Sequence, residues 1–185
     1  MENNLENTWK PLVSEVLPDQ FLFDLGAYLQ TCAHIETTAC DFICAVEGVR
    51  PDSQAWRKRF SALRKMTISD LLPVLRKSAG RLPEPLPSQF FDFVDWIKEY
   101  SRNRHIAVHG AFYTSKSPGK LRVIYTHKVK SSVGTEFHQD ETELDRKSAL
   151  EILHDADRVL RTLAGLVAAI DRGEVTMMPQ GDSQR

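Results

Sequence analysis

The chain has 185 residues, of which 42% are hydrophobic, and its formal net charge at pH 7 is -1. This length and composition suit one well-packed domain better than two, so we expect a single domain over residues 1–175. Residues 176–185 have no apolar periodicity, and we expect a disordered tail there. No apolar run of about 18 residues and no secretory signal are present, which argues against a membrane protein and predicts a cytoplasmic one.

The three cysteines give no sign of a disulfide framework. Cys32, Cys40 and Cys44 all fall in one expected helix. An odd number of cysteines so placed does not match a zinc-ligand spacing either. We therefore expect buried free thiols, no metal and no cofactor.

The near-neutral net charge hides two basic blocks. Residues 50–81 contain nine basic and two acidic residues, and residues 101–135 contain seven basic residues and no acidic one. Such blocks predict a positive surface for a polyanion such as RNA, unless folding places acidic helices beside them. The candidate RNA-binding residues lie on the exposed side of the first block: Arg57, Lys58, Arg59, Arg64 and Lys65.

Helical periodicity dominates the pattern of apolar residues. Steps of three and four predict a long core helix from Pro18 to Gly48, with Glu36 as the polar member of its apolar stripe. Because a helical stripe drifts, the alternative is that Glu36 lies at the edge of the stripe. A second helix is expected over residues 52–67, a third over residues 69–78 with Ser69 as its cap, and an extended proline-rich connector over residues 82–87.

The second half of the chain predicts two more helices around a hairpin. Ser88 can cap a helix whose inward stripe includes Arg104 and which ends at Gly110, so His109 lies at its C-terminal end. Alternating apolar residues around a turn at 117–120 predict a small β-hairpin, and residues 145–171 predict a closing core helix. The fold class is therefore mainly all-α, a bundle of about four main helices with a small inserted β-hairpin.

The segment from Ser101 to Gly110 concentrates the residues that could act on a phosphodiester. Arg104 can hold a phosphate, and His109 can move protons near neutral pH without a cofactor. The candidate supporting residues are Arg102 for phosphate, Asn103 for orientation, His105 for proton transfer and Glu36 for positioning the arginine. One histidine and one arginine make an incomplete site, so we expect a twofold dimer to complete it.

Two other interpretations of this segment stay open. His105 and His109 have the spacing of the paired histidines in zinc hydrolases, but the glutamate of that motif and a third ligand are missing. Alternatively, Arg104 pairs with Glu36 inside the bundle and His109 only ends a helix, a purely structural arrangement.

The Arg104-to-His109 spacing resembles the motif of the HEPN superfamily, and the resemblance extends over roughly residues 18–171. It is carried by Leu25-Gly26, Ile35-Glu36, Asn103-Arg104 and His109-Gly110, together with the inserted hairpin and the closing helix. It implies a helical bundle, homodimerisation and, in active members, metal-independent RNA cleavage by the arginine and the histidine.

The HEPN resemblance also implies a biological setting and leaves one assignment open. The setting is a toxin-antitoxin or phage-defence system, with an antitoxin or a nucleotidyltransferase as partner. The chain has His105 after Arg104, where family members often have Asn or another polar residue, whereas Asn103 follows Arg102. Either arginine could be the functional one, and spacing favours Arg104. The alternative function is a non-catalytic RNA-binding, protein-interaction or dimerisation module.

The last expectation concerns Glu36. We expect its carboxylate to face the bundle interior within reach of Arg102, Arg104 or His109. A buried carboxylate and a core-facing arginine are each costly alone, and the cost falls when they meet.

Overall fold

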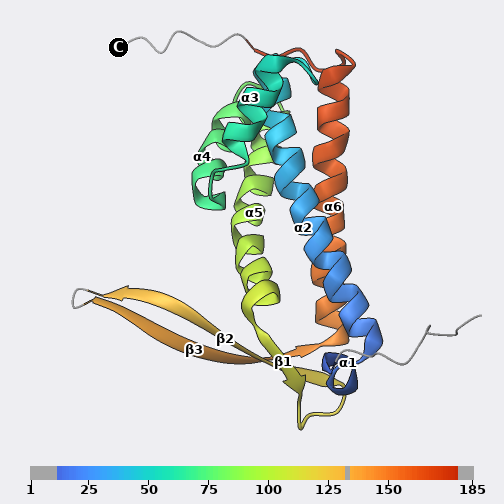
Figure 1. Ribbon diagram of the computed structural model, residues 1–185. Coiled ribbons are helices and arrows are strands. Elements are labelled where there is room, and N and C mark those ends of the chain that lie inside the picture. Colours follow the sequence, from blue (N-terminus) through green and yellow to red (C-terminus); the bar gives the residue numbers. More distant parts are fainter. Residues whose placement is uncertain (1–11, 132–133, 179–185) are drawn as a thin grey trace, which may run out of the picture. The chain divides into compact units, whose positions relative to one another are not determined.

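The computed structural model describes residues 12–131 and 134–178 (Figure 1). The chain divides into two compact units. The sheet unit comprises residues 12–29 and His105–His154, and the helical unit comprises Gln30–Arg104 and residues 155–178. Residues 179–185 of the expected tail lie outside the described residues. Within the described part, no helix is both long and apolar enough to cross a membrane.

Three long helices lie in the ranges where the apolar periodicity predicts them. Helix α2 spans Asp19–Val46, α5 spans Leu86–His109 and α6 spans Arg146–Asp171. Gly48, just beyond α2, has a φ of 74°, which L-residues with side chains rarely adopt and which glycine allows at a helix end. Asp145 accepts a hydrogen bond from the Ser148 backbone N–H at 2.7 Å, so its carboxylate caps α6. The helices predicted for residues 18–48 and 145–171 are confirmed.

The shorter helices differ from the prediction at their ends. Helix α3 spans Gln54–Leu63 and α4 spans Ile68–Ala79, whereas the short helix α1 at Val13–Val16 was not predicted at all. Ser53 caps α3 by accepting from the Trp56 N–H. Thr67, not Ser69, caps α4, because its hydroxyl accepts from the Asp70 N–H. The prediction of Ser69 as the cap was therefore wrong by two residues. The described chain has five helices of ten or more residues, one for each range in which the sequence predicted a helix.

The proline-rich connector is also shorter than predicted. Helix α5 begins at Leu86, which places Pro87 in its first turn and Ser88 inside the helix. A proline fits there because the N–H groups of the first turn have no partner within the helix. The predicted cap at Ser88 and the extended conformation up to residue 87 were wrong for this reason.

The inserted segment is a three-stranded antiparallel sheet, not a single hairpin. Strand β1 spans Ala111–Thr114, β2 spans Lys120–Ser131 and β3 spans Gly134–Asp145, in the order β1-β2-β3. Strand β1 pairs only with Leu121–Ile124 of β2, whereas β3 pairs with β2 along its whole length. The part of β2 beyond Ile124 therefore forms a two-stranded ribbon with β3 (Figure 1).

Each unit has its own apolar packing. In the helical unit the rings of Phe42 and Phe90 stack with centroids 4.7 Å apart, which joins α2 to α5. Cys32, Cys40 and Cys44 are buried free thiols, as predicted. In the sheet unit Leu121, Val123 and Tyr125 alternate along β2 and are buried. A β-carbon at Gly110 would lie 2.5 Å from the Ile106 carbonyl oxygen, so only glycine fits where α5 turns into β1.

Candidate functional site

The predicted motif occupies the C-terminal end of α5, and the division between the two units falls within it. Arg102, Asn103 and Arg104 belong to the helical unit, and His105 and His109 belong to the sheet unit. Arg102 is exposed, whereas Asn103 and Arg104 are partly buried. His105 and His109 are both exposed to solvent.

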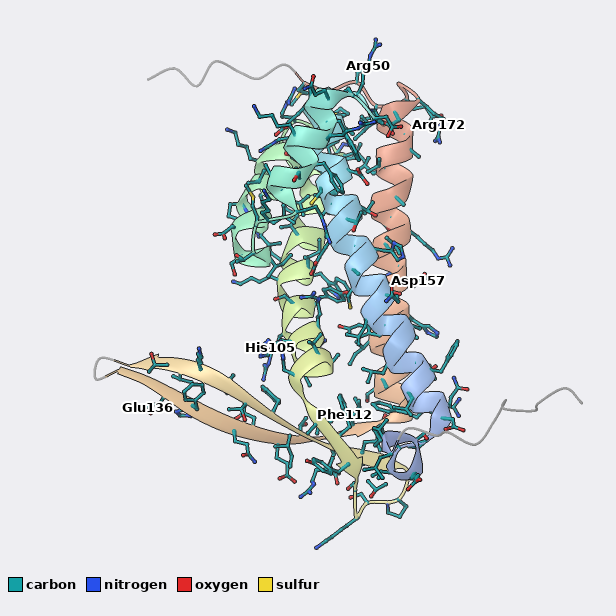
Figure 2. The ribbon with its side chains drawn as sticks, viewed as in Figure 1. Arg50, His105, Phe112, Glu136, Asp157 and Arg172 are labelled. Atoms are coloured by element: carbon teal, nitrogen blue, oxygen red, sulfur yellow. The ribbon has the colours of Figure 1, made fainter. Side chains whose placement is uncertain are left out.

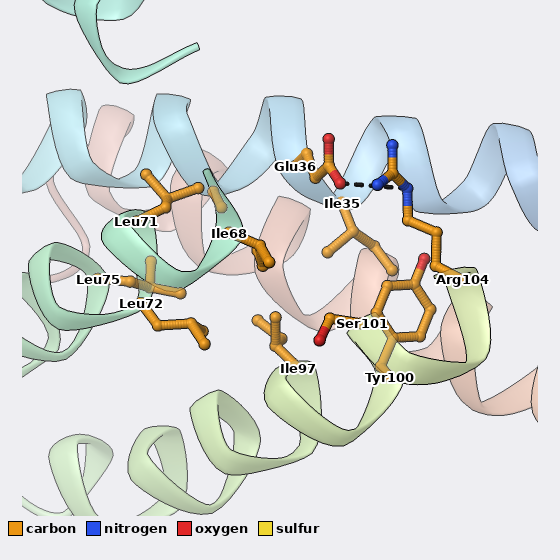
Figure 3. Close-up of a pocket in the computed structure, with 11 residues that line it drawn as sticks. Ile35, Glu36, Ile68, Leu71, Leu72, Leu75, Ile97, Tyr100, Ser101 and Arg104 are labelled. Carbon is orange, nitrogen blue, oxygen red and sulfur yellow. Dashed lines mark ion pairs between the residues drawn. The ribbon is translucent and has the colours of Figure 1, made fainter. Parts of the chain in front are cut away.

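In the helical unit, Glu36 lies between two arginines from different segments. The Arg104 Nε atom is 3.3 Å from Glu36 Oε1, and the Arg64 Nη1 atom is 3.9 Å from Glu36 Oε2. The expected pairing of Glu36 with one of the motif residues is confirmed, and Arg104 is the partner (Figure 3). One carboxylate thus faces two guanidinium groups, which leaves a local excess of positive charge.

This ion pair is less buried than predicted. The side chain of Glu36 is 23% exposed and that of Arg104 is 42% exposed. Arg104 therefore does not point into the core, because the pair lies where the side chains of α2, α4 and α5 leave an opening. Water screens such a pair, so it stabilises the fold much less than a fully buried pair would.

A polar cavity opens beside this cluster. It has a volume of about 270 Å³ and is lined by Glu36, Cys40, Arg64, Thr67 and Arg104, together with the apolar Leu63, Met66, Ile68 and Leu71. A second cavity lies on the α5 side of Glu36, and its lining is mainly apolar, with Ile35, Leu75, Ile97 and Tyr100 (Figure 3). Two guanidinium groups at a cavity of this size can hold a phosphate by charge-assisted hydrogen bonds.

Burial makes the thiol in this cavity unreactive. Burial raises the pKa of Cys40 to about 11, and burial likewise raises the pKa of Cys44 to about 11. Both thiols therefore stay protonated near neutral pH, whereas nucleophilic chemistry needs the thiolate. The chemistry available at the cavity is that of its arginines and its carboxylate.

In the sheet unit the two histidines of the motif lie together. The His105 and His109 ring centroids are 4.7 Å apart, as the i,i+4 spacing requires (Figure 2 labels His105). Within residues 12–131 and 134–178, no three His, Cys, Asp or Glu side chains are arranged to hold a metal ion. The two rings are placed to exchange protons with a molecule arriving from solvent.

The first basic block is only partly available to a polyanion. Arg59 donates two hydrogen bonds to Glu47, at 2.8 and 2.6 Å, which neutralises it. Arg76 forms an ion pair with Asp95 through a single hydrogen bond from its Nη2 atom. Arg57, Lys58 and Lys65 are exposed, with no carboxylate of the described side chains within 4 Å. Folding has thus neutralised some of the basic residues and left others free to meet solvent.

A cluster of titratable groups on the β2-β3 ribbon was not predicted. The Tyr125 hydroxyl donates to Asp140 Oδ2 at 2.9 Å, and the His127 Nδ1 atom lies 3.6 Å from the same oxygen. His127 faces His138 across the ribbon with ring centroids 6.1 Å apart. The register pairs Tyr125 with Asp140 and His127 with His138. The cluster would have been predicted if β3 had been recognised as a strand. The residues of β3 are mostly polar on both faces, however, and show no alternation of apolar and polar residues.

Comparisons with protein-family models, curated proteins and solved structures found no match to this chain.

Proposed function

We propose that the chain is a metal-independent endoribonuclease of HEPN type in which Arg104 and His109 are central. The observation that carries this proposal is the position of Arg104 beside Arg64 at a polar cavity of about 270 Å³. Two guanidinium groups against one carboxylate favour a bound phosphate. The exposure of His109 and its spacing from Arg104 in the sequence support the same assignment.

Each residue has a defined chemical task in this reaction. Cleavage through the ribose 2′-hydroxyl needs a group that takes its proton, a group that protonates the leaving oxygen and a positive charge at the phosphoryl oxygens. His109 serves the proton transfers, and Arg104 supplies the charge. Arg102, Asn103 and His105 assist by binding phosphate, orienting the substrate and exchanging protons.

A second copy of the chain completes the reaction. One His109 cannot be base and acid in the same step, and a twofold dimer supplies two. The exposed Arg57, Lys58, Arg64 and Lys65 attract RNA to the helical unit, while Arg59 is engaged with Glu47 and contributes less. The setting is a toxin-antitoxin or phage-defence system, with an antitoxin or nucleotidyltransferase partner.

One observation favours a second candidate function. Arg104 already has a carboxylate partner in Glu36, which is what a structural role would require. The second candidate is therefore a non-catalytic RNA-binding or dimerisation module whose polar residues hold the protein together. Substitution of Arg104 would then lower stability or dimerisation without altering any RNA.

The test incubates purified protein with several single-stranded RNAs in the presence of EDTA. Wild type is expected to cleave, whereas Arg104→Ala and His109→Ala lose cleavage. The matched controls are Arg76→Ala, which removes another arginine paired with a carboxylate, and His154→Ala, which removes another exposed histidine. Both controls are expected to cleave like wild type. Intact RNA with wild type, or cleavage by both motif variants, contradicts the proposal.

A further inference from the structure

The two faces of the β2-β3 ribbon carry different chemistry. Successive residues of a strand point to opposite faces, and directly opposed residues of two antiparallel strands share a face. Tyr125, His127, His138 and Asp140 therefore share the histidine face, with Glu136, which lies 3.3 Å from His138. Lys128 and Phe137, and Thr126 and Gln139, are opposed pairs on the other face, named here the lysine face. Figure 2 labels Glu136 on this ribbon.

An aromatic ring is exposed on the lysine face. The side chain of Phe137 is 68% exposed, and the only other large apolar residue of β3 is Leu144. The Lys128 Nζ atom lies 5.6 Å from the centroid of its ring, a distance at which a cation is attracted to the ring face. An exposed ring with a cation beside it can stack on a nucleobase while the lysine meets the phosphate.

The part of the lysine face around Phe137 carries no carboxylate among its opposed pairs. The opposed pairs Lys128 with Phe137 and Thr126 with Gln139 contain no carboxylate. Asp140 and Glu136 point to the histidine face, where they contact Tyr125 and His138. The nearest carboxylate along β3 on the lysine face belongs to Glu141, two residues from Gln139.

Closer to β1, the lysine face carries a second pair of a cation and an aromatic ring, which can be compared with Lys128 and Phe137. The Arg122 guanidinium lies 5.3 Å from the centroid of the Tyr113 ring, so a second cation and aromatic pair is present there. This pair is bordered by Glu141, 3.7 Å from Arg122, and by Glu143. Hydrogen bonds from Ser115, Ser117 and Lys120 lower the pKa of Glu143 to about 2, so its charge persists at neutral pH. These carboxylates balance the charges of Arg122 and Lys120, so the face near Tyr113 lacks the uncompensated cation that Lys128 provides near Phe137.

We infer that the lysine face around Phe137 and Lys128 binds single-stranded RNA by stacking one base on the Phe137 ring. A single strand fits because its bases are free to stack on a side chain, whereas duplex bases are already stacked on one another. Gln139 and Thr126 supply hydrogen-bonding groups beside the stacked base. The inference rests on the proposed function for the identity of the substrate as RNA and adds that the substrate is single-stranded.

The test separates binding from cleavage. The probe is a fluorescein-labelled single-stranded oligoribonucleotide with 2′-O-methyl sugars, which cannot be cleaved through a 2′-hydroxyl. Its binding to the full chain is measured by fluorescence anisotropy, with circular dichroism to check folding. Phe137→Leu is expected to weaken binding at least about fivefold, the effect of losing one stacked base. Phe137→Trp keeps a stacking ring and is expected to restore binding.

Two further variants test the role of charge. Lys128→Gln is expected to weaken binding and to reduce the salt dependence by about one phosphate contact. Tyr113→Leu is the matched control, because its ring also has a cation beside it but lies near two carboxylates. It is expected to bind the probe as wild type does.

The inference is overturned if wild type does not bind the probe, or if Phe137→Leu binds it as wild type does. It is also overturned if Phe137→Leu changes only the molar mass in solution, because the face would then contact a second copy. The proposed function can fail separately. Unmodified RNA that stays intact while Phe137-dependent binding persists refutes the ribonuclease and leaves the binding face in place.

Discussion

Replacement of Glu36 by glutamine should change stability and anion binding in opposite directions. The Glu36 carboxylate lies 3.3 Å from Arg104 and 3.9 Å from Arg64, and both arginine side chains are about two-fifths exposed, at 42% and 41%. Pairs exposed to this extent contribute about 0.2 to 1 kcal/mol each. Loss of both should therefore cost about 1 kcal/mol of the free energy of unfolding, well below the 3 to 5 kcal/mol typical of a fully buried pair.

That loss corresponds to a fall in Tm of about 2 to 4 °C for a chain of this size. The same substitution frees two guanidinium groups at the cavity, so pyrophosphate should bind about fivefold more tightly, the equivalent of about 1 kcal/mol. Differential scanning calorimetry measures the Tm, and isothermal titration calorimetry measures pyrophosphate binding. Glu47→Gln, which removes the partner of Arg59, is the control that should lower Tm without changing pyrophosphate binding.

Two results would refute this reasoning. An unchanged Tm together with unchanged pyrophosphate affinity would mean that Glu36 does not interact with either arginine. A fall in Tm of 10 °C or more would mean that the pair is buried after all, since about 3 kcal/mol or more is then lost. A double-mutant cycle of Glu36→Gln with Arg104→Ala isolates the energy of the pair itself.

Three more predictions follow from the geometry of single residues. Hydrogen bonds depress the pKa of Glu143 to about 2, below its ordinary 4.5. The stabilisation that its carboxylate provides should therefore be present above pH 4.5 and lost as the pH falls toward 2. In a series of Tm measurements over this range, Glu143→Gln should show a smaller fall in Tm than wild type. Burial raises the pKa of Cys40 and Cys44 from 9.0 to about 11, so iodoacetamide at pH 8 should alkylate them far more slowly in the folded than in the urea-unfolded protein, and equal rates would contradict this burial. Gly110→Ala should cost about 1 to 3 kcal/mol in urea unfolding, because its β-carbon would lie 2.5 Å from the Ile106 carbonyl oxygen; an unchanged midpoint would show that the turn relaxes.

The helices were predictable where the buried apolar residues recur with the period of an α-helix. The stripes of α2 and α6 place apolar residues at steps of three and four over more than six turns, so small errors at the ends do not alter the assignment. The cap of α4 was not predictable in the same way. Thr67 and Ser69 are both good caps, and only the backbone conformation, extended at Thr67, distinguishes them.

Strand β3 could not be predicted because it forms by pairing with β2 and buries few of its own side chains. Most of Gly134–Asp145 is exposed on both faces, so no alternation of apolar and polar residues marks it as a strand. Its partner β2 is recognisable from Leu121, Val123 and Tyr125. The cluster on the histidine face and the pair of Lys128 with Phe137 on the lysine face both depend on the register between β2 and β3. The sequence of β3 alone does not reveal this register.

The ion pair of Glu36 with Arg104 was predictable from the sequence, but the exposure of this pair to solvent was not. The apolar stripe of α2 correctly indicated that Glu36 meets a positive partner, since a carboxylate on such a stripe needs one. How much solvent reaches the pair depends on the opening beside α4, where the cavity lined by Arg64 and Thr67 lies. Packing between helices sets the size of that opening, and no local pattern encodes it.

The central claim is tested most directly by the chemistry of the RNA ends after incubation with wild-type protein in EDTA. Attack by the 2′-hydroxyl leaves a 2′,3′-cyclic phosphate on one fragment and a 5′-hydroxyl on the other, and mass spectrometry of the fragments identifies both. We expect these ends with wild type and with Arg76→Ala, and no fragments with His109→Ala. Intact RNA with wild type, or the same ends produced by His109→Ala, would contradict the assignment of a metal-independent endoribonuclease.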